Sequence, residues 1–148
     1  MNRKPERVLE VESGAWDRMR ALSREGYPEE VCGVLLGEVT PRKATEVISV
    51  RNVHQVSRRS RFEVDPLEYQ KIEREADERG RMVLGFYHSH PDHPAVPSQT
   101  DAAYAAGWPD YSFVIVTVAR GKTAGFRSWR WSETQGVFLE ESVIRRAV

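Results

Sequence analysis

The sequence predicts an α+β fold made from a single domain of 148 residues. Apolar runs with the two-residue alternation of β-strands are separated by segments with helical periodicity and recognisable start and stop residues. The chain has no internal repeat and no low-complexity linker. Because a chain of this length can bury about two-thirds of its unfolded surface without cross-links, we expect one domain over residues 1–148.

The first third of the chain predicts one helix and two strands. The helix is expected to begin with Ser13 as its N-cap and to end at Gly26. A strand over residues 31–36 and an alternating strand over residues 45–50 are expected to pair across a turn near Pro41.

A second helix is expected in the middle of the chain. A short strand over residues 62–64 should lead into it. Asp65 is the expected N-cap, Pro66 the first helical residue, and Glu68 the residue that completes a capping box. Gly80 is expected to end this helix.

The C-terminal third predicts the centre and the close of a sheet. Residues 111–118 are apolar enough for a central strand, and residues 124–131 and 136–139 look like closing strands. A frayed or helical tail is expected after them. Trp129 and Trp131 share one face of a strand, so sheet packing explains them better than stacking on single-stranded nucleic acid.

Composition and charge exclude several classes of protein. The 22 basic and 22 acidic residues are interspersed and give no net charge, which argues against broad nucleic-acid binding. A single cysteine, Cys32, excludes an internal disulfide and suits a reducing cytoplasm. Neither a signal peptide nor a membrane span is indicated. We therefore expect a cytoplasmic protein with no nucleic-acid and no membrane partner.

Two histidines and an aspartate in one short stretch form a candidate metal site. His88 and His90 follow an apolar strand over residues 82–87, and extended residues two apart point to the same face. Ser98 opens a short helix whose first turn carries Asp101. A catalytic zinc site uses three protein ligands and leaves its fourth position open. Ser98 and Asp101 alone predict only a capping box, but the four residues together favour a metal.

Other polar residues near this stretch have simpler interpretations. His93 is expected to be an exposed loop histidine, and Cys32 a buried, inert thiol. The most basic stretch, Arg51 to Arg61, predicts a solvated loop. Docking of a partner protein is the alternative for this loop.

The motif resembles the signature of the JAMM (MPN-plus) metalloproteases. The run His88-Ser89-His90-Pro91 is followed by Ser98 and Asp101, and the stretch Pro28 to Gly37 is similar to the family's upstream motif. The residue that matches the family's glutamate is Glu30. The resemblance extends from about Trp16 to Val118. The loop over residues 91–97 looks like that of the small bacterial and archaeal members rather than that of the related RadC proteins.

The resemblance implies a fold and a set of site residues. The fold is a mixed, curved β-sheet flanked by helices, in an MPN/JAMM-like and cytidine-deaminase-like arrangement. One Zn²⁺ per chain would be bound by His88, His90 and Asp101. Glu30 would be the general base, and Ser98 would donate a hydrogen bond to the developing oxyanion.

The resemblance also implies a substrate class. Similar small members hydrolyse the amide bond after the C-terminal Gly-Gly of a ubiquitin-like sulfur-carrier protein, and release an amino acid such as cysteine or a few C-terminal residues. An isopeptidase that removes ubiquitin-like modifiers from conjugates and a non-catalytic MPN-type scaffold are the alternatives. The sequence leaves open the carrier, the leaving group, the oligomeric state (a homodimer included) and whether His93 occupies a fourth zinc position at rest.

Overall fold

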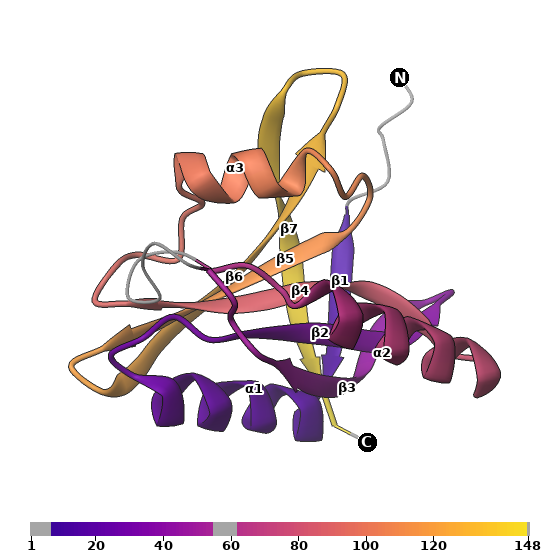
Figure 1. Ribbon diagram of the computed structural model, residues 1–148, viewed down its shortest axis with the longest axis horizontal. Helices are drawn as coiled ribbons and strands as arrows, with labels where there is room; N and C mark the ends of the chain where they lie inside the picture. The colour runs from indigo at the N-terminus through magenta and orange to yellow at the C-terminus, as the bar shows by residue number, and fades with distance from the viewer. Residues whose placement is uncertain (1–6, 55–61, 148) are drawn as a thin grey trace.

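A seven-stranded barrel with three helices outside it forms the part of the chain described by the computed structural model, residues 7–54 and 62–147 (Figure 1). The strands are β1 (Val8–Glu12), β2 (Cys32–Val39), β3 (Arg42–Val50), β4 (Met82–Pro91), β5 (Ser112–Ala119), β6 (Lys122–Ser132) and β7 (Val137–Arg146), and the helices are α1 (Ser13–Gly26), α2 (Pro66–Glu78) and α3 (Gln99–Ala105). In Figure 1, α1 runs below the strands, α3 lies above β4 and β5, and α2 lies at the right.

The sheet is mixed, as expected, and it curves until it closes into a barrel. Strand β2 pairs antiparallel with β3 and β4, whereas β4 and β5 are parallel. Strands β5, β6 and β7 continue as antiparallel neighbours. Strand β1 pairs in parallel with both β3 and β7 and so closes the barrel. The predicted α+β class is therefore confirmed.

Strand β5 holds the central position that its apolar sequence predicts. It lies between β4 and β6, and residues 112–116 are all buried. Side chains on both faces of such a strand need apolar neighbours, which explains why the strand reads as a nearly continuous apolar run. The register pairs His88 with Ile115 and Cys32. The candidate metal motif therefore lies deep within the sheet, not at its edge.

The expectation of a frayed or helical C-terminal tail is wrong. Strand β7 continues to Arg146 and pairs with β1 from Val8 to Glu12. Val143 packs against the core, and Arg146 forms an ion pair with Glu10 at 2.8 Å. The tail is extended because β1, which was not predicted, supplies a strand partner more than a hundred residues away in sequence.

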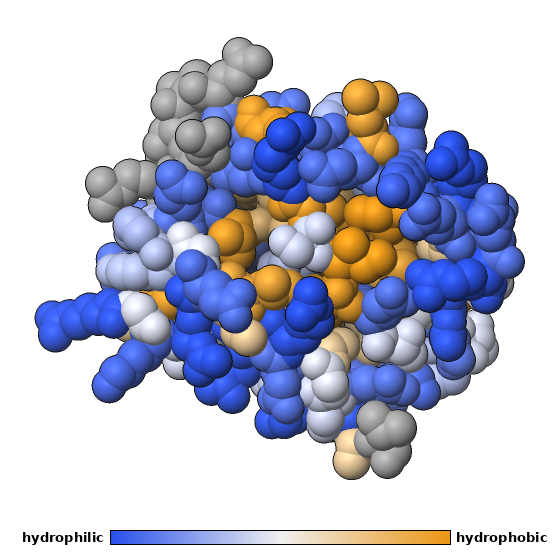
Figure 2. All heavy atoms as spheres, turned by 60° about the horizontal axis from the view of Figure 1, so that its bottom comes forward, coloured by the Kyte–Doolittle hydropathy of each residue, from blue (hydrophilic) through white to orange (hydrophobic). Residues whose placement is uncertain are grey.

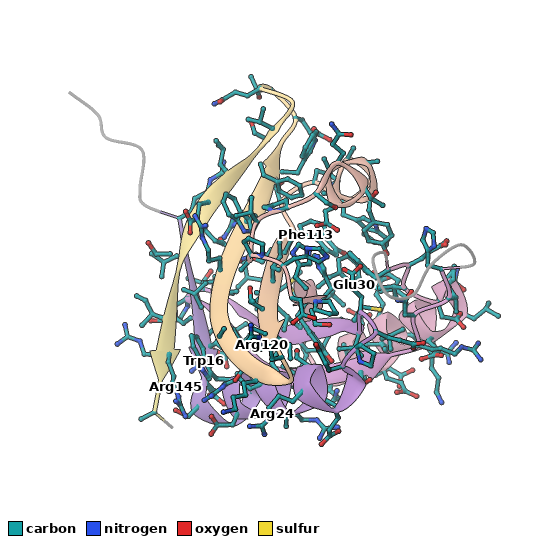
Figure 3. The ribbon with its side chains drawn as sticks, turned by 90° about the vertical axis from the view of Figure 1, so that its left-hand side faces the viewer. Trp16, Arg24, Glu30, Phe113, Arg120 and Arg145 are labelled. Carbon is teal, nitrogen blue, oxygen red and sulfur yellow. The ribbon has the colours of Figure 1, made fainter. Side chains whose placement is uncertain are left out.

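Helix α1 begins at Ser13 itself, so the prediction of Ser13 as N-cap is wrong. Glu12 occupies the N-cap position without a side-chain capping bond, and Ser13 Oγ accepts a hydrogen bond from Arg145 Nε at 3.3 Å. The predicted end at Gly26 is confirmed. Trp16 stacks on Phe126, with ring centroids 4.3 Å apart, and Figure 3 shows Trp16 beside Arg145. This contact fixes α1 to the barrel.

Helix α2 has the predicted N-cap but not the predicted capping box. Asp65 Oδ1 accepts hydrogen bonds from the backbone N–H groups of Leu67 and Glu68. The Glu68 carboxylate accepts a hydrogen bond from the Arg51 backbone instead, at 3.4 Å. The expected strand over residues 62–64 is reduced to a single bridge between Asn52 and Val64. Arg58, Arg59 and Arg61 of the expected basic loop lie outside the described residues.

The two tryptophans of β6 pack within the protein, as predicted. Trp131 contacts the Phe138 ring edge-on, and Trp129 Nε1 donates a hydrogen bond to the Ala95 carbonyl at 3.1 Å.

On the face shown in Figure 2, hydrophilic side chains surround a hollow in which apolar side chains gather. None of the helices in residues 7–54 and 62–147 is long and apolar enough to cross a membrane.

Candidate metal centre

Two strand residues and one helix residue bring three ligand atoms together. His88 and His90 project from β4 on one face, and Asp101 lies in the first turn of α3. The two Nε2 atoms are 3.0 Å apart. Asp101 Oδ2 lies 3.3 Å from His88 Nε2 and 3.2 Å from His90 Nε2. The three atoms therefore form a nearly equilateral triangle, and all three residues are buried.

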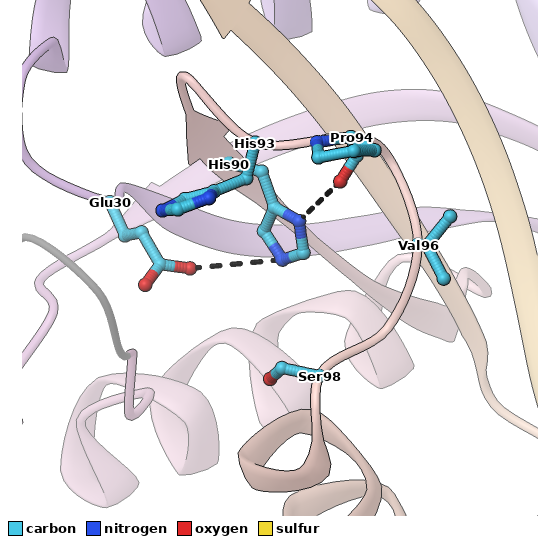
Figure 4. Close-up of a pocket in the computed structure, with 6 residues that line it drawn as sticks. All are labelled: Glu30, His90, His93, Pro94, Val96 and Ser98. Atoms are coloured by element: carbon cyan, nitrogen blue, oxygen red, sulfur yellow. Dashed lines mark hydrogen bonds and ion pairs between the residues drawn. The ribbon is translucent and has the colours of Figure 1, made fainter.

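The size of this triangle fits zinc. Ligands at 2.0–2.1 Å from a tetrahedral zinc ion lie about 3.3 Å from one another. His90 Nδ1 donates a hydrogen bond to the Pro94 carbonyl at 2.8 Å when that nitrogen carries the proton, which leaves the Nε2 lone pair for a metal (Figure 4). Two imidazoles and one carboxylate are also a donor set that zinc prefers. The residues present can therefore hold the ion that the sequence predicts.

Electrostatics favour metal-binding protonation states at two of the three groups. Burial alone would raise the pKa of Asp101, but the neighbouring His88, His90 and Ser98 N–H hold it well below its ordinary value. Burial lowers the pKa of His88, although Asp101 partly opposes this effect. An anionic carboxylate and a neutral imidazole are the forms that bind zinc.

His90 is shifted the other way. Burial lowers its pKa, but hydrogen bonds to Asp101 and Pro94 outweigh burial, so that the pKa is raised overall. Zinc binding would therefore displace a proton from this imidazole, which makes metal affinity fall at low pH.

Glu30 lies beside the triangle on the loop between α1 and β2. Its side chain is 4% exposed, and its Oε1 atom lies 4.0 Å from His90 Nε2. The Glu30 backbone carbonyl accepts a hydrogen bond from Asn52 Nδ2 at 3.0 Å. Within the described residues, Oε2 has no hydrogen-bond partner. Burial raises the Glu30 pKa to about 7; His90 opposes this rise and Asp101 adds to it.

Either carboxylate could serve as the third ligand on proximity alone. Ligand atoms of Glu30, His88 and His90 also lie within 4.8 Å of one another. The Asp101 carboxylate, however, is closer to both imidazoles and has the lower pKa. A pKa near 7 suits a general base, whereas a ligand must be anionic. The geometry thus favours Asp101 as ligand and Glu30 as base.

Ser98 is the N-cap of α3, and the capping box that its sequence predicts is present. Ser98 Oγ accepts a hydrogen bond from the Asp101 backbone at 3.0 Å, and Asp101 Oδ2 accepts one from the Ser98 backbone at 2.9 Å. A hydroxyl that accepts one hydrogen bond can still donate its own proton. Capping and donation to a substrate oxygen are therefore compatible.

A cavity of about 270 Å³ opens beside these residues (Figure 4). Its lining residues are Glu30, His90, His93, Pro94, Val96 and Ser98. His93 is exposed, as expected, and its ring stands edge-on to that of His90 with the centroids 6.4 Å apart. Glu30, His90 and Ser98 thus line the same space (Figure 4).

Several supporting residues escaped prediction from sequence. Ser89 lies between the two histidines, where its Oγ accepts a hydrogen bond from Val31 N at 2.9 Å and its N–H donates to Val31 O at 3.0 Å. Phe62 stacks on the His88 ring at 4.2 Å. These contacts join segments far apart in sequence, so no local sequence pattern predicts them. Cys32 is buried, and burial next to Glu30 raises its pKa to about 12, so it is the inert thiol expected.

Curated relatives are similar to this chain over most of its length. The chain is 39% identical to the desampylase of Haloferax volcanii over 72% of the chain and 78% of that protein. It is 29% identical to the CysO-cysteine peptidase of Mycobacterium tuberculosis over 92% of the chain and 90% of that protein. A probable TtuB-protein conjugate cleaving protease of Thermus thermophilus is 35% identical over 64% of the chain and 61% of that protein.

Solved structures have the same fold. Protein DSY2949 of Desulfitobacterium hafniense matches with a TM-score of 0.82 and 26% identity, covering 95% of this chain and 94% of that one. AF2198, a JAB1/MPN domain protein of Archaeoglobus fulgidus, matches with a TM-score of 0.58 and 18% identity over 91% and 98% of the two chains. Residues 12–132 match the domain described as prokaryotic homologs of the JAB domain. The chain therefore belongs to this prokaryotic JAB-domain family, the small prokaryotic branch of the JAMM (MPN-plus) proteins.

Proposed function

We propose that the chain is a zinc-dependent peptidase that hydrolyses the amide bond after the C-terminal Gly-Gly of a ubiquitin-like sulfur-carrier protein. The observation that carries the proposal is the buried triangle of His88, His90 and Asp101 with Glu30 beside it. Membership of the prokaryotic JAB-domain family supports a hydrolase. The substrate class is supported by the relatives, which include a CysO-cysteine peptidase.

One zinc ion per chain would be held by His88, His90 and Asp101. Bound there, the ion would supply a Lewis acid that polarises the substrate carbonyl and acidifies water. The Nδ1 contact of His90 with Pro94 would keep the His90 ring oriented for this role.

Glu30 is the residue that would move the proton. With a pKa near 7, its carboxylate would take a proton from the attacking water and deliver it to the leaving amine nitrogen. Its burial and its position 4.0 Å from His90 Nε2 support this role. Ser98 would donate its free hydroxyl proton to the developing oxyanion.

The shape of the cavity favours a slim peptide segment. At about 270 Å³, it is smaller than most ligand pockets, and Pro94 and Val96 form part of its wall. Glycine residues carry no side chain that would collide with this wall. A Gly-Gly terminus is therefore a fitting occupant next to the scissile bond.

The second candidate is an isopeptidase that removes ubiquitin-like modifiers from protein conjugates. The similarity to a probable TtuB-protein conjugate cleaving protease favours it. Both candidates use the same residues and differ only in the leaving amine. A non-catalytic scaffold is disfavoured because the chain retains the complete set of ligands, base and hydroxyl donor.

We also propose that residues 1–148 form one domain without a membrane or nucleic-acid partner. The first and last strands, β1 and β7, pair with each other, so the barrel uses both ends of the chain.

The proposal is tested by zinc content and cleavage on the same preparations. Elemental analysis should find about one zinc per chain in the parent protein and much less in the His88→Ala variant. Cleavage of a carrier extended beyond Gly-Gly by one cysteine should disappear with the metal. A carrier joined to a lysine side chain, assayed in parallel by mass spectrometry, separates peptidase from isopeptidase. A parent that binds no added zinc and cleaves neither substrate would favour the scaffold.

A further inference from the structure

One hydrogen bond ties the loop that carries Glu30 to the loop that follows the metal-ligand strand. The Tyr27 hydroxyl donates to Asp92 Oδ2 at 2.6 Å. We propose that Tyr27 and Asp92 are positioning residues that hold Glu30 in place for its proton transfers. This inference rests on the proposed function, in which Glu30 is the general base.

Asp92 joins three segments of the protein. Its Oδ1 accepts a hydrogen bond from the Arg120 backbone N–H at 2.8 Å, at the turn between β5 and β6. Its own backbone N–H donates to the Val118 carbonyl at 2.8 Å. Hydrogen bonds from Arg120 and Tyr27 lower the pKa of Asp92, so its carboxylate is anionic and its hydrogen bonds are charge-assisted. Asp92 thus anchors the Glu30 loop to both β4 and β5.

The backbone of Asp92 also suits this role. Its φ angle is 58°, in the left-handed region that aspartate and asparagine enter more readily than most residues. The chain can therefore turn directly after Pro91, at the end of β4, while the side chain points back toward Tyr27. Backbone conformation and side-chain bonding are separate properties that substitutions can distinguish.

The residues on both sides of Glu30 in sequence are attached to β4 or to the loop directly after it. On its C-terminal side, Val31 exchanges hydrogen bonds with Ser89. On its N-terminal side, the Tyr27 to Asp92 bond makes the second attachment. Ser89 and Asp92 lie on either side of His90 in sequence. Each attachment therefore fixes the position of the Glu30 loop relative to this proposed metal ligand.

The Glu30 carboxylate depends on these attachments because its own contacts are few. Its closest ionic partner among residues 7–54 and 62–147 is His90 Nε2 at 4.0 Å, and within the same residues Oε2 has no hydrogen-bond partner. With few polar contacts of its own, the carboxylate depends for its position on how the Glu30 backbone is held. A displacement of about 1 Å in a catalytic group can cost on the order of a hundredfold in rate. Loss of the Tyr27 to Asp92 bond should lower kcat while substrate binding and the metal ligands stay intact.

The test uses full-length, zinc-loaded protein and a carrier extended beyond Gly-Gly. Tyr27→Phe removes only the donor hydroxyl. Asp92→Gly keeps the left-handed backbone and removes the acceptor, whereas Asp92→Ala loses both. Tyr111→Phe is the matched control, because it removes a tyrosine hydroxyl hydrogen-bonded to Tyr69 at 2.8 Å, away from the cavity.

We expect kcat to fall about tenfold in Tyr27→Phe and by ten- to a hundredfold in Asp92→Gly, with KM within about twofold. Zinc should stay near one per chain. The Tyr27→Phe/Asp92→Gly double variant should be no slower than Asp92→Gly alone, because the shared bond is already absent. Tyr111→Phe should keep the parent kcat. If Asp92→Gly matches the parent while Asp92→Ala is slow, only the backbone matters and the inference is overturned.

A second readout does not depend on activity. Amide hydrogen exchange at Tyr27, Glu29 and Glu30 should accelerate in Tyr27→Phe and Asp92→Gly, while the amides of residues 113–116 in the central strand β5 keep their protection. Unchanged exchange would refute the proposal that the Tyr27 to Asp92 hydrogen bond holds this loop, whatever the cleavage rates of the variants. A parent that cleaves no carrier would refute the proposed function and, with it, the catalytic consequence of the tether. A parent that cleaves, with variants that cleave equally well, would refute the positioning role alone.

Discussion

Glu30 and Asp101 are buried carboxylates beside the same pair of imidazoles, and their pKa values are shifted in opposite directions. Burial raises the Glu30 pKa to about 7. The Asp101 pKa is held below its ordinary value, against the effect of burial, by His88, His90 and the Ser98 N–H. Two carboxylates separated in this way can take different roles at one pH, one as a permanent anion and one as a proton carrier.

Glu30→Gln should separate metal binding from turnover. The variant keeps the size of the side chain and all three proposed zinc ligands, so zinc content should stay near one per chain. Removal of a general base costs roughly a hundredfold to ten-thousandfold in rate. Elemental analysis and a cleavage assay on one preparation check both halves. Near-parent turnover in Glu30→Gln would assign the base to another residue.

The metal-free protein should show the buried Glu30 in its pH-dependent stability. The folded-state pKa of about 7 lies above the ordinary value of 4.5, so the protonated form is favoured in the fold. This contribution to stability is complete below pH 4.5 and is lost as the pH rises through 7. The Glu30→Gln variant keeps a neutral side chain at every pH in this range, so its stability does not fall for this reason. The variant should therefore exceed the parent in unfolding free energy by about 3 kcal/mol above pH 7.

Urea unfolding in the presence of a chelator, at several pH values, measures this difference. His88, His90 and Asp101 titrate in both proteins, so their effects largely cancel when the two curves are subtracted. The difference should be small near pH 4.5 and grow with pH. A difference that does not change with pH would show that the Glu30 pKa is the same in the folded and unfolded chains.

Ser98→Ala should lower both activity and stability. Loss of one oxyanion donor costs on the order of a hundredfold or more in kcat. Loss of the N-cap of α3 costs about 1 kcal/mol of unfolding free energy. Ser98→Thr, which retains the hydroxyl, should recover most of both. Ser98→Gly should recover most of the stability alone, since glycine is a tolerable N-cap, and a fast Ser98→Gly enzyme would exclude the oxyanion role.

Local patterns in the sequence predicted the parts of the fold and site that depend on neighbouring residues. Asp65 as a cap, the Ser98 capping box and the apolar β5 strand each follow from a few adjacent side chains. The parts that were missed depend on partners far away in the chain. Strand β1 and the full length of β7 exist because they pair with each other. Ser13 fails as a cap because Glu12 remains in β1 up to the helix.

The site shows the same division. His88, His90, Ser98 and Asp101 fall within one strand–loop–helix segment, so their convergence could be anticipated from spacing. Only the resemblance to the family predicted that Glu30 belongs to the same site as His90. Its supports, which include Asn52, Ser89 and the Tyr27 to Asp92 bond, could not be inferred from spacing because each bridges separate segments.

The buried ion pair between Arg130 and Glu141 should matter more for stability than the neighbouring exposed pair. Glu141 is 3% exposed, and it accepts hydrogen bonds from Arg130 Nε at 2.6 Å and Ser128 Oγ at 2.7 Å. Glu141→Ala leaves Arg130 partly buried and unpaired, which should cost about 3 kcal/mol or more of unfolding free energy. Glu140→Ala is the matched control, because Glu140 pairs with Arg127 on the exposed surface at 2.8 Å.

The control should cost less than about 1 kcal/mol, because solvent screens exposed ion pairs. Urea unfolding of both variants at neutral pH compares the two pairs directly. Neither substitution touches the cavity, so the zinc content of both variants should equal that of the parent at temperatures where they remain folded. Equal losses in the two variants would mean that burial gives the Arg130 to Glu141 pair no special weight. A large loss in Glu141→Ala alone would show that β6 and β7 are held together by a desolvated charge pair, not by apolar packing alone.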